Sequence, residues 1–434
     1  MEPQVYTLKN GLTVILVDTK AFPTLTTLLL VGAGSRYETT ENNGIAHFFE
    51  HMAFKGSHKY PNSLLISSII EGLGGVFNAF TSKDSTGYWI KATTDHFETV
   101  LDVLSDMIIH PLLLEDEIER EKGVIVEEIN LYEDTPYRKV GELYEELLYK
   151  GNPLGYEITG TKDSVRSFTR ITFTDYISQL YHPQNAVLVV AGGFQHSKLF
   201  DPQFHRILAL VEEKFGRWKP NGGTPEFQRV TEHQDKPQIQ VVYKKTEQAH
   251  FCLGFRAFSF FDERKYALSV LTAILGGGMS SRLFTEVREK RGLCYYISTG
   301  RELYHDVGNL VTQAGVTNNV EKIKESIRVI LAEHKKIVHG DVRKEELENA
   351  KELLKGRLLL SMEDSHQIAS FLGSRKILQN QVTTPAQTVE RIRAVTFEDV
   401  FSLAQEILRP KNLNFVMVGP VEKESEIEEA FREF

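Results

Sequence analysis

The chain is organised around one stretch of its sequence, Asn43-Gly44-Ile45-Ala46-His47-Phe48-Phe49-Glu50-His51-Met52-Ala53-Phe54-Lys55-Gly56. No proline interrupts the stretch after its first glycine, and its residues suit a helix. Positions four apart lie on one face of a helix, so His47 and His51 can aim two imidazoles at one point. Glu50 lies one turn from His47 and can reach the same point. The stretch therefore predicts a helix that gathers two imidazoles and a carboxylate on one side.

Two histidines at this spacing are natural ligands for Zn²⁺, which favours imidazole nitrogen and carboxylate oxygen. A nearby carboxylate that does not bind the metal can accept a proton from a water that the metal activates. The simpler alternative is that these three residues are ordinary polar side chains of an amphipathic helix. The choice depends on whether the rest of the chain supplies the missing parts of a metal site.

Length and composition are typical of a soluble globular protein with more than one domain. The chain has 434 residues, of which 41% are hydrophobic and 25% are charged, and this length exceeds one ordinary core. The net charge of −9 argues against a nucleic-acid surface, because phosphate binding needs a basic patch. The two cysteines, Cys252 and Cys294, are too few for a disulfide framework or a thiolate metal site.

The sequence shows neither a targeting segment nor a membrane span. Met1 to Asn10 is polar and lacks the apolar centre of a secretory signal. The apolar run Leu25 to Val31 is far too short to cross a bilayer. We therefore expect no membrane association and predict that the chain resides in the cytoplasm.

A second segment, Glu115 to Glu133, is predicted to be a helix, since it begins with the acidic residues that helix N-termini prefer. Glu121 and Glu128 within it are seven residues apart, nearly two turns, so both carboxylates face the same way. One can ligate a metal while the other lies behind it and orients the ligands. The alternative is a solvated acidic face, the more common fate of a glutamate-rich helix.

Several short segments of the first half have the pattern of strands. Tyr6 to Asp18 predicts a hairpin, and Thr24 to Val31 predicts a further strand. Two glycines precede the run Val76 to Ser82 and indicate that the backbone there approaches another group closely. Thr86 to Ala92 alternates in the manner of one more strand.

The second half repeats the pattern of the first. Thr172-Phe173-Thr174-Asp175 is echoed by Thr396-Phe397-Glu398-Asp399, and Pro183-Gln184-Asn185 before a strand is echoed by Pro410-Lys411-Asn412. We interpret the repetition as a duplication that produced two homologous lobes. The lobes would comprise residues 1–222 and 237–434, joined by a linker at 223–236. Only the first contains His-x-x-Glu-His, so only the first is expected to hold a metal.

The second half also carries a glycine-rich segment, Gly276-Gly277-Gly278-Met279-Ser280-Ser281-Arg282-Leu283-Phe284, followed by Arg288 and Tyr295. A glycine-rich turn before a helix can bind phosphate. This one lacks the Gly-Lys-Ser/Thr ending of a P-loop and the spacing of a dinucleotide fingerprint. We therefore do not predict a nucleotide site.

Together these segments resemble the pitrilysin family of zinc peptidases, which includes insulin-degrading enzyme and the mitochondrial processing peptidase. His47 to His51 has the H-x-x-E-H motif of the inverzincins, a reversal of the commoner H-E-x-x-H. The resemblance covers essentially the whole chain. It also rests on Glu121 and Glu128, on Asn78-Ala79-Phe80-Thr81, and on Arg288 with Tyr295 seven residues later.

The resemblance implies roles for the residues of the first half. One zinc ion per chain would be held by His47, His51 and Glu128. Glu50 would act as the general base, and Glu121 would orient the ligands from behind. Glu127 is a rival for the third ligand, but Glu128 falls at the family's spacing and shares a face with Glu121.

The resemblance also implies how substrate binds. The strand that contains Asn78, Ala79, Phe80 and Thr81 would be a free sheet edge that pairs with extended peptide, with Asn78 on the peptide backbone. Asn78 has a plainer alternative, which is to terminate the strand. Arg288 would hold a substrate carbonyl, and the Tyr295 hydroxyl would stabilise the oxyanion.

The implied fold is α+β, with two homologous lobes that each place helices on a mostly antiparallel sheet and together form a half-clamshell. The implied activity is that of a zinc-dependent endopeptidase that cleaves short or unfolded peptides inside a dimeric chamber. One chain holds both the histidine motif and the Arg288–Tyr295 pair, so we expect a homodimer with two composite sites. The alternatives are a heterodimer with a different chain and a non-catalytic scaffold, although scaffold relatives usually lose metal ligands.

Overall fold

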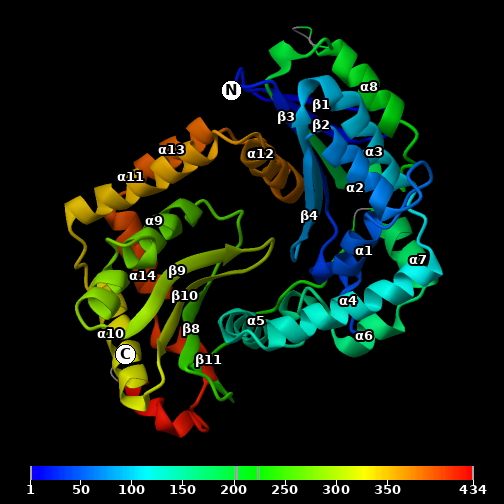
Figure 1. Cartoon of the computed structure of the whole chain (residues 1–434). Helices are drawn as coiled ribbons and strands as arrows, with labels where there is room; N and C mark the ends of the chain where they lie inside the picture. The colour runs from blue at the N-terminus through cyan, green and yellow to red at the C-terminus, as the bar shows by residue number, and fades with distance from the viewer. Residues whose placement is uncertain (1, 200, 202–203, 222, 224, 433–434) are drawn as a thin grey trace. The chain divides into compact units, whose positions relative to one another are not determined.

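A computed structural model describes residues 2–199, 201, 204–221, 223 and 225–432 (Figure 1). The chain forms two compact units. The first unit comprises Met1–Ile129, Tyr156–Gln228 and Leu360–Thr384, and the second comprises Asn130–Gly155, Arg229–Leu359 and Pro385–Phe434. The units thus differ from the continuous halves expected from sequence, because 130–155 and 360–384 each belong to the unit of the other half. Residues 222 and 224, at the expected boundary, lie outside the described residues.

The first unit is built on a six-stranded sheet with the order β1-β2-β6-β3-β5-β4 in its described residues. The strands are β1 (Gln4–Thr7), β2 (Thr13–Asp18), β3 (Thr24–Val31), β4 (Val76–Thr81), β5 (Thr86–Thr93) and β6 (Ala186–Gly192). Neighbours are antiparallel except β2 and β6, which run parallel. The central strands β3 and β6 are buried along almost their whole length, and both are rich in Leu and Val. β4 is an edge strand, and its outer side is not paired with another described strand.

Helices cover both faces of this sheet (Figure 1). The elements that belong to the unit are α1 (Ile45–Ala53), α2 (Ser63–Gly72), α3 (Phe97–Ile109), most of α4 (Glu115–Glu133), α6 (Lys162–Ser167), α7 (Arg170–Leu180), α8 (His205–Phe215) and α12 (Ser365–Gln379). The main core lies between the sheet and the helices of the first half. α12 covers the other face, where Ile368 and Leu372 pack on Leu30 and Val189.

The second unit is built on a five-stranded sheet with the order β7-β11-β8-β10-β9 in its described residues. The strands are β7 (Gln238–Tyr243), β8 (Gln248–Ala257), β9 (Cys294–Leu303), β10 (Gly308–Thr317) and β11 (Leu413–Gly419). Its helices are α5 (Pro136–Leu148), α9 (Lys265–Gly276), α10 (Val320–Val338), most of α11 (Lys344–Ser361), α13 (Pro385–Ala394) and α14 (Phe397–Ile407). α5 packs Val140 and Tyr144 on one sheet face, against Cys252 and Val416.

The two units repeat one topology, which confirms the prediction of an α+β fold with homologous lobes. If β1 is set aside, both sheets place the first strand beside the last, then the second, the fourth and the third. The first and last strands are parallel in both, β2 with β6 and β7 with β11. Among the residues that the structure describes, no helix combines the length and the apolar character needed to cross a bilayer.

Candidate metal centre

The start of α1 is held by a buried carboxylate. Gly44 adopts a φ of +97°, which glycine tolerates, and the helix begins at the next residue. Glu38 accepts hydrogen bonds from the Gly44 and Ala46 backbone N–H groups at 2.8 and 2.9 Å, and from the Asn43 side-chain amide at 2.9 Å. Burial raises the pKa of Glu38 to about 8, against the effect of these donors. The contacts satisfy N–H groups that the helix cannot pair, and they set the direction in which α1 leaves the loop.

The rest of α1 is oriented by an apolar stripe. Ile45, Phe48, Phe49 and Met52 follow the helical period and are buried. Phe48 meets the Phe173 ring edge-on at 5.0 Å between centroids. This packing fixes the rotation of the helix about its axis, so the histidines and Glu50 lie to the side of the stripe.

His47, His51 and Glu128 come together between α1 and α4. One ligand atom from each lies within 4.8 Å of the others. Glu128 Oε2 is 3.6 Å from His47 Nε2 and 3.7 Å from His51 Nε2, which is too long for a hydrogen bond. Ligands about 2.1 Å from a tetrahedral zinc ion lie roughly 3.4 Å apart, so these groups fit such an ion. Glu127, the rival for the third position, is exposed and is not part of this group.

Glu121 lies behind His51. Its Oε1 is 2.8 Å from His51 Nδ1, and its side chain is only 3% exposed. Because a carboxylate only accepts, Nδ1 carries the proton and Nε2 keeps the lone pair that a metal needs. Lys55 Nζ lies 2.5 Å from the other oxygen of Glu121. Burial acts to raise the pKa of Glu121, but the hydrogen bonds with His51 and Lys55 outweigh it and hold that pKa below its ordinary value.

Glu50 lies beside the three ligand groups and is held from the sheet. The Thr81 hydroxyl donates a hydrogen bond of 2.6 Å to Glu50 Oε2. Burial raises the pKa of Glu50 above its ordinary value, although the Thr81 hydrogen bond and the neighbouring His51 act to lower it. A carboxylate with a raised pKa beside a metal site is suited to accept and return a proton.

The predicted substrate strand is the edge strand β4. Ala79 donates its backbone N–H to the Asn78 side-chain oxygen at 2.8 Å, and Asn78 is exposed. Phe80 packs with the apolar cluster on the α12 side of the sheet, which gives that side chain a structural role. Of the four residues predicted here, only Thr81 is seen to touch Glu50 through its side chain.

Arg288 and Tyr295 belong to the second unit, and both lie on irregular backbone. Arg288 is in a π-helical turn, Phe284–Glu289, a geometry that is frequent at functional sites. Tyr295 lies where the β9–β10 register shifts, and its side chain is 74% exposed. The Arg288 guanidinium carbon is 5.8 Å from the centre of the Tyr295 ring. The bulge turns Tyr295 outward, whereas Arg288 is half-buried and its guanidinium carbon lies 4.7 Å from the centre of the Phe284 ring.

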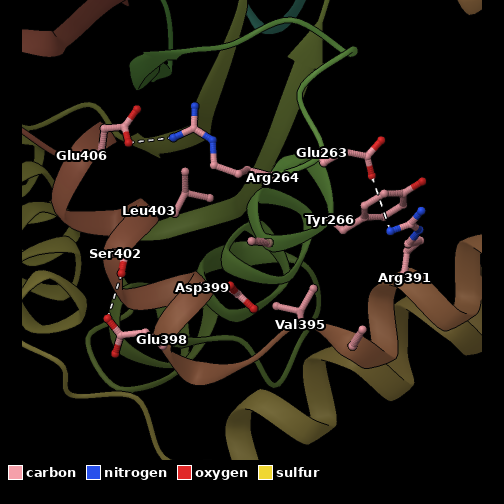
Figure 2. Close-up of a pocket in the computed structure, with 12 residues that line it drawn as sticks. Glu263, Arg264, Tyr266, Arg391, Val395, Glu398, Asp399, Ser402, Leu403 and Glu406 are labelled. Atoms are coloured by element: carbon pink, nitrogen blue, oxygen red, sulfur yellow. Dashed lines mark hydrogen bonds and ion pairs between the residues drawn. The ribbon is translucent and has the colours of Figure 1, made fainter.

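A separate cavity of about 380 Å³ lies in the second unit, between the start of α9, α13 and α14 (Figure 2). Its charged groups pair within its own wall. Arg264 contacts Glu406 at 2.7 Å and Arg391 contacts Glu263 at 3.9 Å, while Ser402 donates to Glu398 at 2.9 Å. The described residues that line it include none of the predicted metal-binding, catalytic or substrate-binding residues.

Sequence reasoning did not anticipate Glu38, Lys55 or the Thr81–Glu50 contact. Glu38 lies seven residues before the first residue of α1, so the usual helix-start signals do not point to it. Lys55 is four residues after His51, and the helical period alone places it near the same neighbour. Thr81 offers no local signal, because its partner Glu50 is 31 residues away in the sequence.

Comparisons with known proteins identify the family of the chain. The model of the insulinase family, peptidase family M16, matches residues 13–162, and the model of the peptidase M16 inactive domain matches residues 167–354. The chain is 36% identical to the uncharacterized zinc protease YmxG of Bacillus subtilis, over 93% of this chain and 95% of that protein. It is 30% identical to an uncharacterized zinc protease of Rickettsia felis, over 95% and 96%.

Solved structures show the same fold. A protease from Helicobacter pylori matches with a TM-score of 0.88 and 24% identity, over 96% of this chain and 99% of that chain. An M16-like peptidase from Alicyclobacillus acidocaldarius matches with a TM-score of 0.82 and 22% identity, over 96% and 98%. The resemblance inferred from the motifs is thereby confirmed, and the chain belongs to the insulinase family, peptidase family M16.

Proposed function

We propose that this chain is a zinc-dependent endopeptidase that hydrolyses short or unfolded peptides. The observation that carries the proposal is the convergence of His47, His51 and Glu128 with Glu50 held beside them. The relatives named as zinc proteases support it, since they match over nearly the whole chain. Among the described residues one group of this kind is found, which supports one zinc ion per chain.

In this proposal His47 and His51 offer imidazole nitrogens and Glu128 offers a carboxylate oxygen, the donor set that zinc prefers. Zinc in such a site lowers the pKa of water towards about 7 and polarises carbonyl groups as a Lewis acid. Glu121 keeps the His51 proton on Nδ1, so that Nε2 stays available. Glu50 takes the proton of the attacking water and passes it to the leaving amine.

The substrate is an extended peptide that pairs with the outer edge of β4. An edge strand offers unpaired backbone donors and acceptors, which bind any extended backbone independently of its sequence. The Ala79 N–H, now satisfied by the side chain of Asn78, is such a donor. A folded protein hides its backbone in its own structure, so short or unfolded peptides are the substrate class that fits.

The active assembly is a homodimer whose two sites are each made from both subunits. Arg288 and Tyr295 of one subunit would face the metal centre of the other, where the guanidinium holds a carbonyl and the phenol stabilises the oxyanion. The exposure of Tyr295 and the irregular backbone around both residues support a role in binding.

The first test is hydrolysis of a mixed set of short unfolded peptides by the purified chain, beside Glu50→Gln. We expect the wild type to cleave and the variant, with the same zinc content, to lose nearly all turnover. A chelator should abolish cleavage and added zinc should restore it. Cleavage by both proteins refutes the role of Glu50. Absence of cleavage by both proteins, with zinc bound, would favour a scaffold role or a missing partner chain.

The composite site is tested with a mixed dimer. Glu50→Gln and Arg288→Ala chains, carrying different tags, are co-expressed and purified by both tags. A composite arrangement leaves one complete site per mixed dimer, so about half of the wild-type activity should return. If each site uses residues of one chain only, the mixed dimer stays inactive. A fully active monomer would also exclude the composite site while leaving the peptidase function intact.

A further inference from the structure

Thr81 links the edge strand to the carboxylate beside the metal ligands. Its hydroxyl oxygen lies 2.6 Å from Glu50 Oε2, within the range of a short, charge-assisted hydrogen bond. A carboxylate has two oxygens, and the hydroxyl engages one of them. The other oxygen of Glu50 is thereby turned away from Thr81, where it can receive the proton of an attacking water.

The strand holds this hydroxyl from a rigid position. Thr81 is paired with Thr86 at the end of the β4–β5 ladder. Side chains alternate across a strand, so Phe77, Ala79 and Thr81 share the face that meets α1. The Phe77 ring lies 5.4 Å from that of Phe54, just past the end of α1, which agrees with this assignment. The β-branched threonine has few rotamers, so its hydroxyl keeps one direction towards Glu50.

The outer edge of β4 serves a different purpose from this inner face. At the edge the Asn78 side chain accepts from the Ala79 N–H, and an arriving peptide would take over that donor. The Thr81 hydroxyl is directed towards α1 instead. The strand β4 thus offers its backbone edge to the substrate and, through the Thr81 side chain, a hydrogen bond to Glu50.

From these contacts we propose that Thr81 is a positioning residue that fixes the general base Glu50, rather than a residue that touches substrate. The proposal rests on the peptidase function proposed above. A glutamate side chain has three torsions. Free rotation about them would misalign the carboxylate with the proton that it must accept. Thr81 restricts that motion from the same strand on which the peptide docks.

The test compares three variants with the wild type. Thr81→Val removes the hydroxyl at nearly constant volume, and Thr81→Ser keeps a hydroxyl. Thr86→Val is the matched control. Its hydroxyl donates to the Ala33 carbonyl at 2.7 Å, so the same substitution costs a hydrogen bond on the partner strand with no contact to Glu50. The measurements are kcat and KM on one peptide, zinc per chain, and the thermal unfolding midpoint.

We expect Thr81→Val to lower kcat about 10- to 100-fold, part of the roughly 10²- to 10⁴-fold that a positioned base contributes. KM and zinc content should stay at wild-type values, and Thr81→Ser should recover most of kcat. Thr86→Val should keep its kcat even if it unfolds at a lower temperature.

A wild-type kcat in Thr81→Val would overturn the positioning role while the peptidase function stands. A higher KM or a lower zinc content in Thr81→Val that Thr81→Ser does not restore would also overturn the positioning role. That pattern marks a role in substrate binding or in structure. If the wild type cleaves no peptide, the proposed function itself fails, and the role of Thr81 fails with it.

Discussion

Replacing Glu121 by glutamine should weaken zinc binding without touching a ligand. Glu121 accepts from His51 Nδ1 with one oxygen and from Lys55 with the other. Glutamine has only one oxygen. If that oxygen faces His51, the amide N–H groups face the Lys55 ammonium, which is also a donor. If the amide faces His51 instead, Nδ1 must accept, the proton moves to Nε2, and the lone pair that would bind zinc is lost.

Either arrangement has a cost that can be estimated from the contacts. Glu121 is almost fully buried, so its hydrogen bonds are not replaced by water. A hydrogen bond to a charged group is worth about 1.5–3 kcal/mol. Groups that orient metal ligands typically change the metal affinity by about 10- to 100-fold when they are lost. We therefore expect the Kd for zinc to rise by about 10- to 100-fold, or roughly 1.4–2.7 kcal/mol.

The assay is competition for zinc with a chromophoric chelator at fixed pH and salt. Glu119→Gln is the control, because Glu119 lies on the same helix, is 68% exposed and pairs with Lys122 at the surface. It should bind zinc as the wild type does. The double variant Glu121→Gln with Lys55→Met should bind zinc better than Glu121→Gln alone, since the amide no longer faces an ammonium. A wild-type Kd in Glu121→Gln would refute the claim that this contact orients His51.

Two further predictions concern stability. Burial acts to raise the pKa of Asp102, but hydrogen bonds from Lys59, Tyr60 and Lys214 outweigh it and lower that pKa to about 2. A depressed carboxyl pKa stabilises the fold above about pH 4, and the gain is lost as pH falls through 2. Asp102→Asn should therefore lower the free energy of unfolding in urea by about 2 kcal/mol at pH 7 and by progressively less below pH 4. A difference between the two proteins that stays constant with pH would contradict this. Gly160 has a φ of +75°, and a Cβ there would lie 2.3 Å from the Asn43 carbonyl oxygen before α1, whereas Gly151 has a φ of +76° and open space. Both Gly→Ala changes carry the backbone cost of about 1–2 kcal/mol. Only Gly160→Ala should lower the unfolding midpoint further and weaken zinc binding. Equal midpoints in the two variants would show that the loop rearranges to accept the added methyl group.

Local periodicity was sufficient to predict the elements that carry the candidate site. The spacing of His47 and His51 requires only the helical repeat, and α1 has the expected register, with Phe48 and Phe49 buried. The same repeat places Glu121 and Glu128 on one side of α4. The alternation of Thr86 to Ala92 required only the pleat of a strand, and β5 has these bounds within one residue.

The partners of these groups could not be predicted in this way. His51 and Glu121 are 70 residues apart, and their contact depends on how deeply α1 and α4 pack together. α5 and α12 pack on different sheets, and no local pattern in either helix specifies the sheet that receives it. Continuous halves were expected because a linker composition lies near the middle of the chain, whereas the compact units exchange 130–155 and 360–384.

By itself the sequence determined the local structure, the duplication and the set of groups able to bind a metal, because each of these follows from spacing along the chain. Only the tertiary structure decided that His51 meets Glu121 across two helices and that Thr81 holds Glu50. These choices depend on the rotation and depth of one packed element against another. Contacts between residues far apart in the chain set both quantities, and no local pattern records them.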